Sequence, residues 1–285
     1  MLDITPHTLA RTYNHPSKDP WEAVQLYELA MTYPDNWGAQ RVATAINTDP
    51  DTPFTGVTRS EVRTWVDGDG MPDAARAVAT ARTHGWMASE WTPTARALAR
   101  LTIGSYACGS ITTSTYAPSW SPDDPDTEAQ LTAALTQVGC DYRHISRRAR
   151  AQGDEYRPAR HGTHLGRALV VAGAPIGDKN AATVTGLPAW VADAPASLRT
   201  ALAQLIVRER SVTQHGKATR RIQTDRDPQY FADVAALLAA VSGEQVTAST
   251  TGVTISAAAV RQFRRADSSG PPTRQRDTTE PATHD

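Results

Sequence analysis

Two distant stretches of the chain resemble each other, and this similarity restricts the folds that the sequence can adopt. The first is SPDDPDTEAQLTAALTQVGCDYRHIS at residues 121–146, and the second is TDRDPQYFADVAALLAAVSGEQVTAS at residues 224–249. Each contains Asp-Pro before a predicted helix, a glycine near the end of that helix, and then a predicted strand. The two helices share apolar residues at positions i, i+3, i+4 and i+7: Leu131, Ala134, Leu135 and Val138, and Val234, Leu237, Leu238 and Val241.

The similarity extends to both sides of these stretches. LARLTIGSYACGSI (98–111) and LRTALAQLIVRERSV (198–212) are predicted helices that lead into a serine and a β-branched residue. HGTHLGRALVVAGAP (161–175) and SAAAVRQFRRA (256–266) are predicted helices that follow the second strand pair. The duplicated order predicts an α/β (α+β) domain built from two αββαββα repeats.

With these motifs, residues 92–265 resemble the LAGLIDADG homing endonucleases in their single-chain form. The helix ends Cys108-Gly109-Ser110 and Glu209-Arg210-Ser211 match the family's paired motif helices, and the segment 166–195 resembles its connection between halves. The resemblance implies pseudo-two-fold repeats at 92–195 and 196–265, whose sheets form a saddle in the major groove of double-stranded DNA. It also implies a carboxylate at the end of each motif helix, for magnesium-dependent cleavage.

The sequence departs from that pattern at the catalytic positions. Cys108 stands where the first carboxylate belongs, and a thiol is a poor ligand for magnesium. Glu209 matches the second acidic position, but Arg208 and Arg210 flank it and would compete with a dication for its charge. Cys108 and Glu209 are therefore interpreted as vestigial catalytic positions, and no metal or other cofactor is expected. An active or nicking endonuclease that uses Glu209 and magnesium is the alternative.

The N-terminal part is predicted to form a helix-turn-helix over residues 21–89, after a flexible arm at 1–20. Gln40 to Ile46 would be the supporting helix and Thr58 to Val66 the recognition helix, which begins with the capping box Thr58 and Glu61. Val57, Val62 and Val66 would face the core. A helical packing module with a solvated arginine face is the alternative. The residues predicted to face a DNA groove are Arg59, Ser60, Arg63 and Thr64.

Cations cluster in HISRRARAQGDEYRPARHGTH (144–164), although the formal net charge of the chain is only −1. The guanidinium group suits phosphate and guanine edges, and a second basic stretch follows the second motif helix. A solvated arginine face is again the alternative. Lys179 is interpreted either as a phosphate contact or as a surface lysine. The DNA contacts predicted from these stretches are Arg147, Arg148, Arg150, Arg157 and Arg160, and Lys217, Arg220 and Arg221.

Composition predicts a soluble, cytoplasmic protein. No apolar run approaches the roughly 18 residues of a membrane helix, and the N-terminus lacks the apolar stretch of a signal peptide. Cys108 and Cys140 are interpreted as free thiols in a reducing compartment. The polar residues 266–285 are predicted to be a disordered tail.

The sequence therefore predicts a double-stranded DNA-binding protein with no membrane contact and no small-molecule substrate. Relatives of the resembled family that join this fold to a helix-turn-helix and do not cut DNA imply transcription regulation. A metal-dependent endonuclease is the second hypothesis, and a protein-interaction module on a nuclease scaffold is the third. DNA binding without metal, and its dependence on salt, would discriminate among the three.

Overall fold

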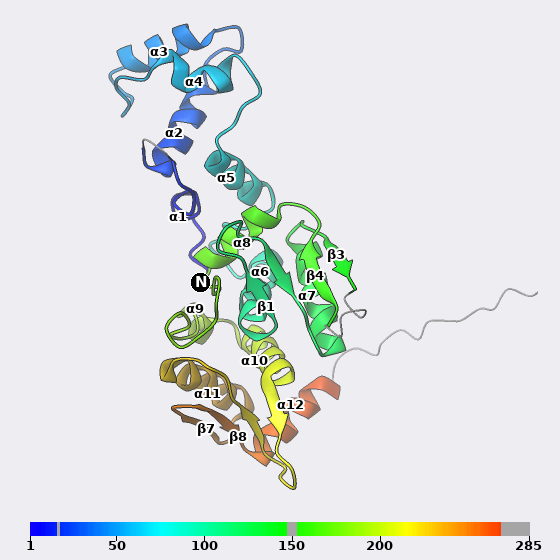
Figure 1. Cartoon of the computed structure of the whole chain (residues 1–285). Coiled ribbons are helices and arrows are strands. Elements are labelled where there is room, and N and C mark those ends of the chain that lie inside the picture. Colours follow the sequence, from blue (N-terminus) through cyan, green and yellow to red (C-terminus); the bar gives the residue numbers. More distant parts are fainter. Residues whose placement is uncertain (16–17, 147–152, 269–285) are drawn as a thin grey trace, which may run out of the picture.

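The computed structural model describes residues 1–15, 18–146 and 153–268, and it combines helices with two four-stranded antiparallel sheets (Figure 1). The predicted mixture of α and β structure is confirmed. Helices α3 and α4 lie at one end of an elongated arrangement, and α11, β7 and β8 lie at the other. No helix within the described ranges is both long and apolar enough to span a bilayer.

Five helices form the N-terminal part, and capping explains where several of them begin. Asp19 accepts a hydrogen bond from the N–H of Trp21 (2.8 Å) and is followed by Pro20, which suits the first helical position. Glu61 accepts from the N–H of Thr58 (3.4 Å), as the capping box predicts. The helices are α1 (Pro6–Ala10), α2 (Pro20–Ala30), α3 (Ala39–Thr48), α4 (Arg59–Val66) and α5 (Asp73–Thr83).

The first ten residues of the segment predicted as a flexible arm (1–20) are packed against the rest of the chain, whereas none of the described residues 11–15 and 18–20 is buried. Leu2, Ile4 and Leu9 are buried and belong to the largest apolar cluster, and α1 packs against α5 and against α8 (Gly162–Val171). Burial of these apolar side chains offsets the entropy lost when the segment becomes ordered.

Helices α2, α3 and α4 share a smaller apolar cluster of their own, which includes Ile46, Val57 and Val62. Asn47 exchanges two hydrogen bonds of 2.8 Å with the backbone of Val57. These bonds hold the long connection between α3 and α4, so the two helices pack together despite a turn longer than the usual three or four residues.

Helix α5 contributes to two apolar clusters of the described residues: Ala74, Ala75 and Val78 pack with Ala10 and Val24 of α1 and α2, whereas other residues of α5 belong to the largest cluster. Ala77, Ala81 and Trp86 lie in that cluster, and the indole of Trp86 donates to the carbonyl of Val138 (3.0 Å). Because α5 packs against α8, it joins the mixed part of the molecule.

The first sheet has the strand order β1-β2-β4-β3, with all neighbours antiparallel. Asp124 caps the helix between its strand pairs by accepting from the N–H of Thr127 (2.9 Å), directly before Pro125. The elements are α6 (Pro93–Ala107), β1 (Gly109–Ile111), β2 (Pro118–Trp120), α7 (Pro125–Gln137), β3 (Tyr142–Ile145) and β4 (Glu155–Pro158), followed by α8.

The second sheet has the same strand order, β5-β6-β8-β7, and is also antiparallel throughout. Asp227 caps its central helix by accepting from the N–H of Gln229 (2.8 Å), again directly before a proline. The elements are α9 (Trp190–Asp193), α10 (Ala196–Arg210), β5 (Ser211–Thr213), β6 (Arg220–Ile222), α11 (Pro228–Ser242), β7 (Val246–Ser249), β8 (Gly252–Ile255) and α12 (Ala257–Ser268).

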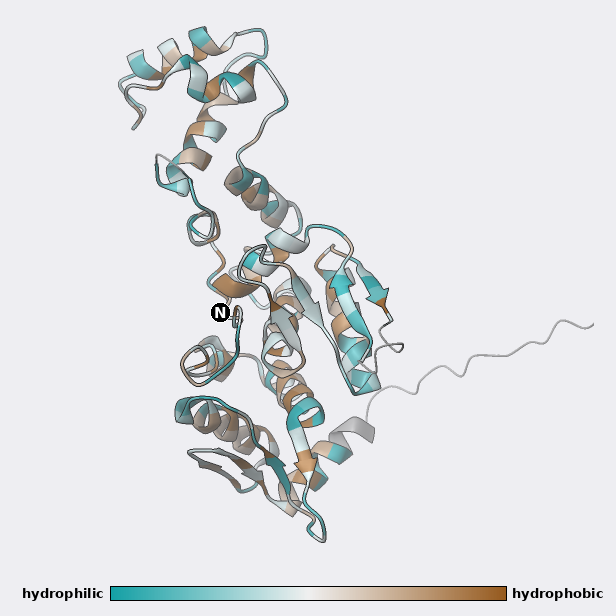
Figure 2. Ribbon diagram, in the orientation of Figure 1, coloured by the Kyte–Doolittle hydropathy of each residue, from teal (hydrophilic) through white to brown (hydrophobic). Residues whose placement is uncertain are grey.

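The core is centred on α6 and α10, which pack against each other. Every residue of α6 from Leu101 to Ala107 is buried. Tyr106 of α6 stacks on Tyr230 of α11 (ring centroids 6.1 Å apart), so the core continues from one sheet unit into the other. Figure 2 shows hydrophobic residues along these central helices and hydrophilic ones on β3 and β4.

The predicted disordered tail begins within α12, which continues to Ser268. Residues 269–285 lie outside the described part of the chain.

Candidate nucleic-acid interface

The ends of α6 and α10 bring Cys108 and Glu209 into one region. Cys108 is the C-cap of α6, and Glu209 is the penultimate residue of α10. Burial is the main cause that raises the pKa of the Cys108 thiol, and the charge of Glu209 raises it further. The two side chains are therefore close enough to interact, and the thiol stays protonated at neutral pH.

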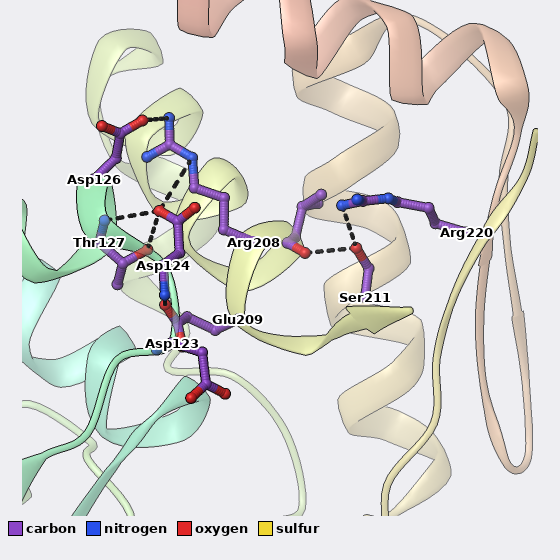
Figure 3. Close-up of polar contacts among 9 residues, drawn as sticks. Asp123, Asp124, Asp126, Thr127, Arg208, Glu209, Ser211 and Arg220 are labelled. Atoms are coloured by element: carbon purple, nitrogen blue, oxygen red, sulfur yellow. Dashed lines mark hydrogen bonds and ion pairs between the residues drawn. The ribbon is translucent and has the colours of Figure 1, made fainter. Parts of the chain in front are cut away.

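Glu209 holds the loop between β2 and α7 (Figure 3). Its Oε2 accepts from the N–H of Asp123 (3.2 Å), and its Oε1 accepts from the N–H of Asp124 (3.3 Å). Burial raises the pKa of Glu209, while these two hydrogen bonds act in the opposite direction. The carboxylate of the second unit thus stabilises a loop of the first.

Arg208 pairs with acidic residues at the start of α7. Its Nη2 lies 3.4 Å from Asp126 Oδ2, and its Nε lies 3.9 Å from Asp124 Oδ1. The Arg208 side chain is only 12% exposed, so these partners orient it toward the first unit. The predicted competition of Arg208 for the charge of Glu209 is thus replaced by contacts with Asp124 and Asp126.

Lys179 is used inside the structure. Its ammonium donates to the carbonyl of Ser105 (2.9 Å) and to that of Gly109, at the end of α6. Burial is the main cause that lowers the pKa of Lys179 to about 8, and the charges of Arg210 and Arg226 contribute to this shift. Of the two interpretations of this residue, neither a phosphate contact nor a freely solvated lysine describes its position.

The donor atoms at this region do not fit magnesium. Magnesium prefers oxygen ligands in a near-octahedral arrangement, whereas Cys108 offers a protonated thiol where a second carboxylate would be needed. Within the described residues, no group of three or more His, Cys, Asp or Glu side chains is arranged to hold a metal ion.

Arginine lies on the face of the first sheet that points away from its helices. Arg143 of β3 pairs in register with Arg157 of β4, and neither is buried. Arg157 also forms a 2.6 Å ion pair with the buried Glu155, which offsets part of its charge. Arg143 was missed from the sequence, although its place one strand residue before His144 could have marked it.

The remaining predicted contacts of the first unit lie beside this sheet or outside the described residues. Arg160 follows β4 and pairs with Asp141. Arg147, Arg148 and Arg150 fall in the range 147–152, which is outside the described part of the chain.

In the second sheet, the neighbouring residues Arg220 and Arg221 of β6 lie on opposite faces. Arg221 pairs in register with Val212 and Thr254, both exposed. Arg220 pairs with the buried Ile255 and donates to Ser211 Oγ (3.1 Å), as Figure 3 shows. Its side chain lines a small hollow with residues of α10 and α12, so the prediction that Arg220 faces DNA is wrong.

The two basic stretches do not occupy equivalent strands. Arg157 lies on β4, whose counterpart in the second sheet is β8, while Arg221 lies on β6, whose counterpart is β2. Lys217 is exposed in the turn between β5 and β6. Along the repeat, the first basic stretch follows the central helix α7, whereas the second precedes the central helix α11.

The predicted recognition helix α4 presents its polar side to solvent. Arg59, Ser60, Arg63 and Thr64 are all exposed, while Val62 is fully buried. Within the described ranges, Arg59 and Arg63 take part in no ion pair. Lys18 reaches the start of the helix and pairs with Glu61.

No known family model matches the chain, and a search of curated proteins also found no match.

Proposed function

We propose that this chain is a double-stranded DNA-binding protein that regulates transcription and does not cut DNA. Its fold would be a degenerate LAGLIDADG-type domain joined to an N-terminal helix-turn-helix. The main support is that α6 and α10 pack together and each continues directly into the first strand of a sheet with the same strand order. A cytoplasmic location belongs to this proposal, because Cys108 and Cys140 are both free.

The repeated order of elements supports a pseudo-two-fold saddle. The sequence α6-β1-β2-α7-β3-β4-α8 is followed by α10-β5-β6-α11-β7-β8-α12, and corresponding strands pair in the same order. In this proposal the faces of the sheets that carry Arg143, Arg157 and Arg221 lie along the duplex.

Binding without cleavage follows from the donor atoms at the ends of α6 and α10. A metal site at these helix ends would have one carboxylate where the resembled family has two. The loss of one preorganised charged contact lowers a rate by a factor of roughly 10²–10³. Glu209 instead ties the first unit to the second. A nick directed by Glu209 is the competing function.

Fluorescence anisotropy with labelled duplex DNA tests the proposal. Binding without metal should weaken with salt, with a log–log slope of about −0.9 for each phosphate neutralised. Arg221→Gln should lower the affinity and reduce the magnitude of the slope by the contribution of about one phosphate contact. Arg220→Gln is the matched control, because it removes the same charge from the helix-covered face and should leave the slope unchanged. Equal losses from both variants, or no binding at all, would contradict the proposed surface.

Incubation of supercoiled plasmid with magnesium or manganese separates the two functions. The proposed binder leaves the plasmid intact. Nicking that Glu209→Gln abolishes would establish the enzyme instead.

A further inference from the structure

An open cavity of about 440 Å³ lies between α9, α10 and α11, on the helical side of the second unit. Its walls are mainly apolar and include Leu187, Pro188, Val191 and Leu237. A volume of roughly 300–1,000 Å³ with apolar walls and a few polar groups is typical of small-molecule sites.

Two opposite charges line this cavity without pairing with each other. Arg199 of α10 and Asp233 of α11 both contribute to the lining, and no ion pair joins them. The Nε of Arg199 is buried and has no hydrogen-bond partner in the described structure, and its Nη1 lies 3.4 Å from the carbonyl of Ala192. Because the Nε is enclosed, the outer part of the guanidinium is what a ligand in the cavity would meet, and a guanidinium favours a carboxylate.

Asp233 can accept from a ligand although its carboxylate is already held in place. Its Oδ2 accepts from the N–H of Leu187 (2.9 Å), and its Oδ1 accepts from the amide of Gln229 (2.7 Å). An ionised carboxylate has about four acceptor sites, so each oxygen can take one further hydrogen bond. The cavity therefore presents one anchored acceptor and one unsatisfied cationic donor beside an apolar wall.

We propose that this cavity binds a free amino acid with an apolar side chain. Arg199 would bind its carboxylate, Asp233 its ammonium group, and the walls formed by Leu187, Val191 and Leu237 its side chain. The inference does not depend on the proposed DNA binding.

The corresponding groove of the first unit shows what distinguishes this cavity. It lies along α6 and α7, where Ala133 takes the place that Ala236 has on α11. Its charged lining residues are Arg96 and Arg100, and no carboxylate accompanies them. Gln130, an uncharged amide, lines that groove, which therefore lacks an anionic partner for an ammonium group and serves as an internal control.

Isothermal titration calorimetry of the full chain with L-leucine and L-phenylalanine tests the inference. At least one should bind with a dissociation constant of about 1 mM or below and raise the unfolding midpoint. Leucinamide and N-acetyl-leucine each remove one ligand charge, and each should bind at least tenfold more weakly. No binding of either amino acid, or binding of leucinamide and N-acetyl-leucine as tight as that of L-leucine, would overturn the inference.

Protein variants locate the site. Arg199→Gln should weaken binding at least tenfold, and Ala236→Phe should block it by filling the cavity. Ala133→Phe makes the same change in the groove between α6 and α7 and should leave binding unchanged. Circular dichroism shows whether each variant is folded. Loss of binding in Ala133→Phe, with binding retained in folded Ala236→Phe, would place the ligand elsewhere and overturn the assignment.

Discussion

Individual glycines mark the places where the backbone of one element lies against another. A Cβ built at Gly166 of α8 would overlap the carbonyl oxygen of Tyr116 and lie 3.2 Å from Pro118 Cδ. Tyr116 itself has a φ of 54°, in the left-handed region that few side chains adopt. Its ring also contacts the guanidinium of Arg167 at 3.8 Å, so the loop cannot easily retreat.

Gly166→Ala should destabilise the protein by about 1–3 kcal/mol, because the methyl group must displace backbone. Helix propensity alone predicts a gain of about 1 kcal/mol, so the two effects differ in sign. Gly162→Ala is the control in the same helix, since its Cβ would have only ordinary contacts with Pro158, at 3.8 Å and beyond. Urea unfolding measures both variants, and equal stability of the two would contradict the close approach.

Arg220 and Arg221 show how a prediction from sequence can fail at the residue scale. Successive strand residues point to opposite faces, so only one of the two can face outward. In RRI the apolar Ile222 is the cue, because Arg220 lies two residues before it and shares its face. The prediction treated the stretch as one block of charge and did not use this alternation, which the register with β5 and β8 bears out.

At the scale of elements, the helices were more predictable than the strand pairing. Asp-Pro at 124–125 and at 227–228 marks helix starts that the structure reproduces, because the carboxylate caps and the proline suits the first turn. Strands of three or four residues give almost no periodicity. The repeat predicted that the C-terminal ends of α6 and α10, with Cys108 and Glu209, lie in one region. It did not predict the hydrogen bonds of Glu209 with the backbone of the β2–α7 loop.

Helix α4 should contribute to DNA binding through its exposed arginines. Arg59→Gln combined with Arg63→Gln should weaken binding and reduce the salt slope by about 2, if both contact phosphates. Anisotropy titrations at several salt concentrations measure the slope. Arg261→Gln on the exposed side of α12 is a control for total charge, and an equal loss in that variant would show that α4 has no special role.

Helices α5 and α8 meet through a histidine cluster that should make stability depend on pH. His161 lies with its ring centroid 5.3 Å from that of His84 and 6.0 Å from that of His164, and His164 Nδ1 lies 3.1 Å from Thr80 Oγ1. Burial is the main cause that lowers the pKa of both His161 and His164. The charges of His84 and Arg160 also lower the pKa of His161. The charges of Arg76 and Arg167 also lower the pKa of His164, and that of Asp73 raises it.

Because the folded pKa values lie below 6.5, the unfolded chain takes up these protons at a higher pH than the folded protein does. The stability that the cluster contributes is thus complete above pH 6.5 and is lost as the pH falls through the lowered values. The unfolding midpoint should therefore decrease below pH 6.5, and the decrease should be smaller in His164→Gln. His215→Gln, in the exposed turn between β5 and β6, should retain the full decrease. An identical pH profile for His164→Gln and the unmodified protein would exclude the cluster as the cause.

On the scale of the whole molecule, the buried apolar side chains of the described residues form three clusters of unequal size, and the third contains Ala10, Val24, Ala74, Ala75 and Val78. The largest apolar cluster runs from Leu2 to Phe263 and includes α6 and α10. The cluster of α2, α3 and α4 contains few fully buried side chains, and its members lie between Leu26 and Val62. Figure 1 shows α3 and α4 away from the sheets, so little of their surface is covered by the rest of the chain.

Unequal burial predicts unequal local stability. Amides of α3 and α4 should exchange with deuterium at least tenfold faster than those of α6 and α10, because opening the small cluster exposes far less apolar surface than opening the core. Hydrogen exchange followed by mass spectrometry resolves these helices as separate peptides. Saturating duplex DNA should slow exchange in α4 much more than in α6, which is already protected by burial. Equal protection of α4 and α6 in the free protein would mean that the two clusters unfold together, and that α3 and α4 are stabilised by contacts other than their own small core.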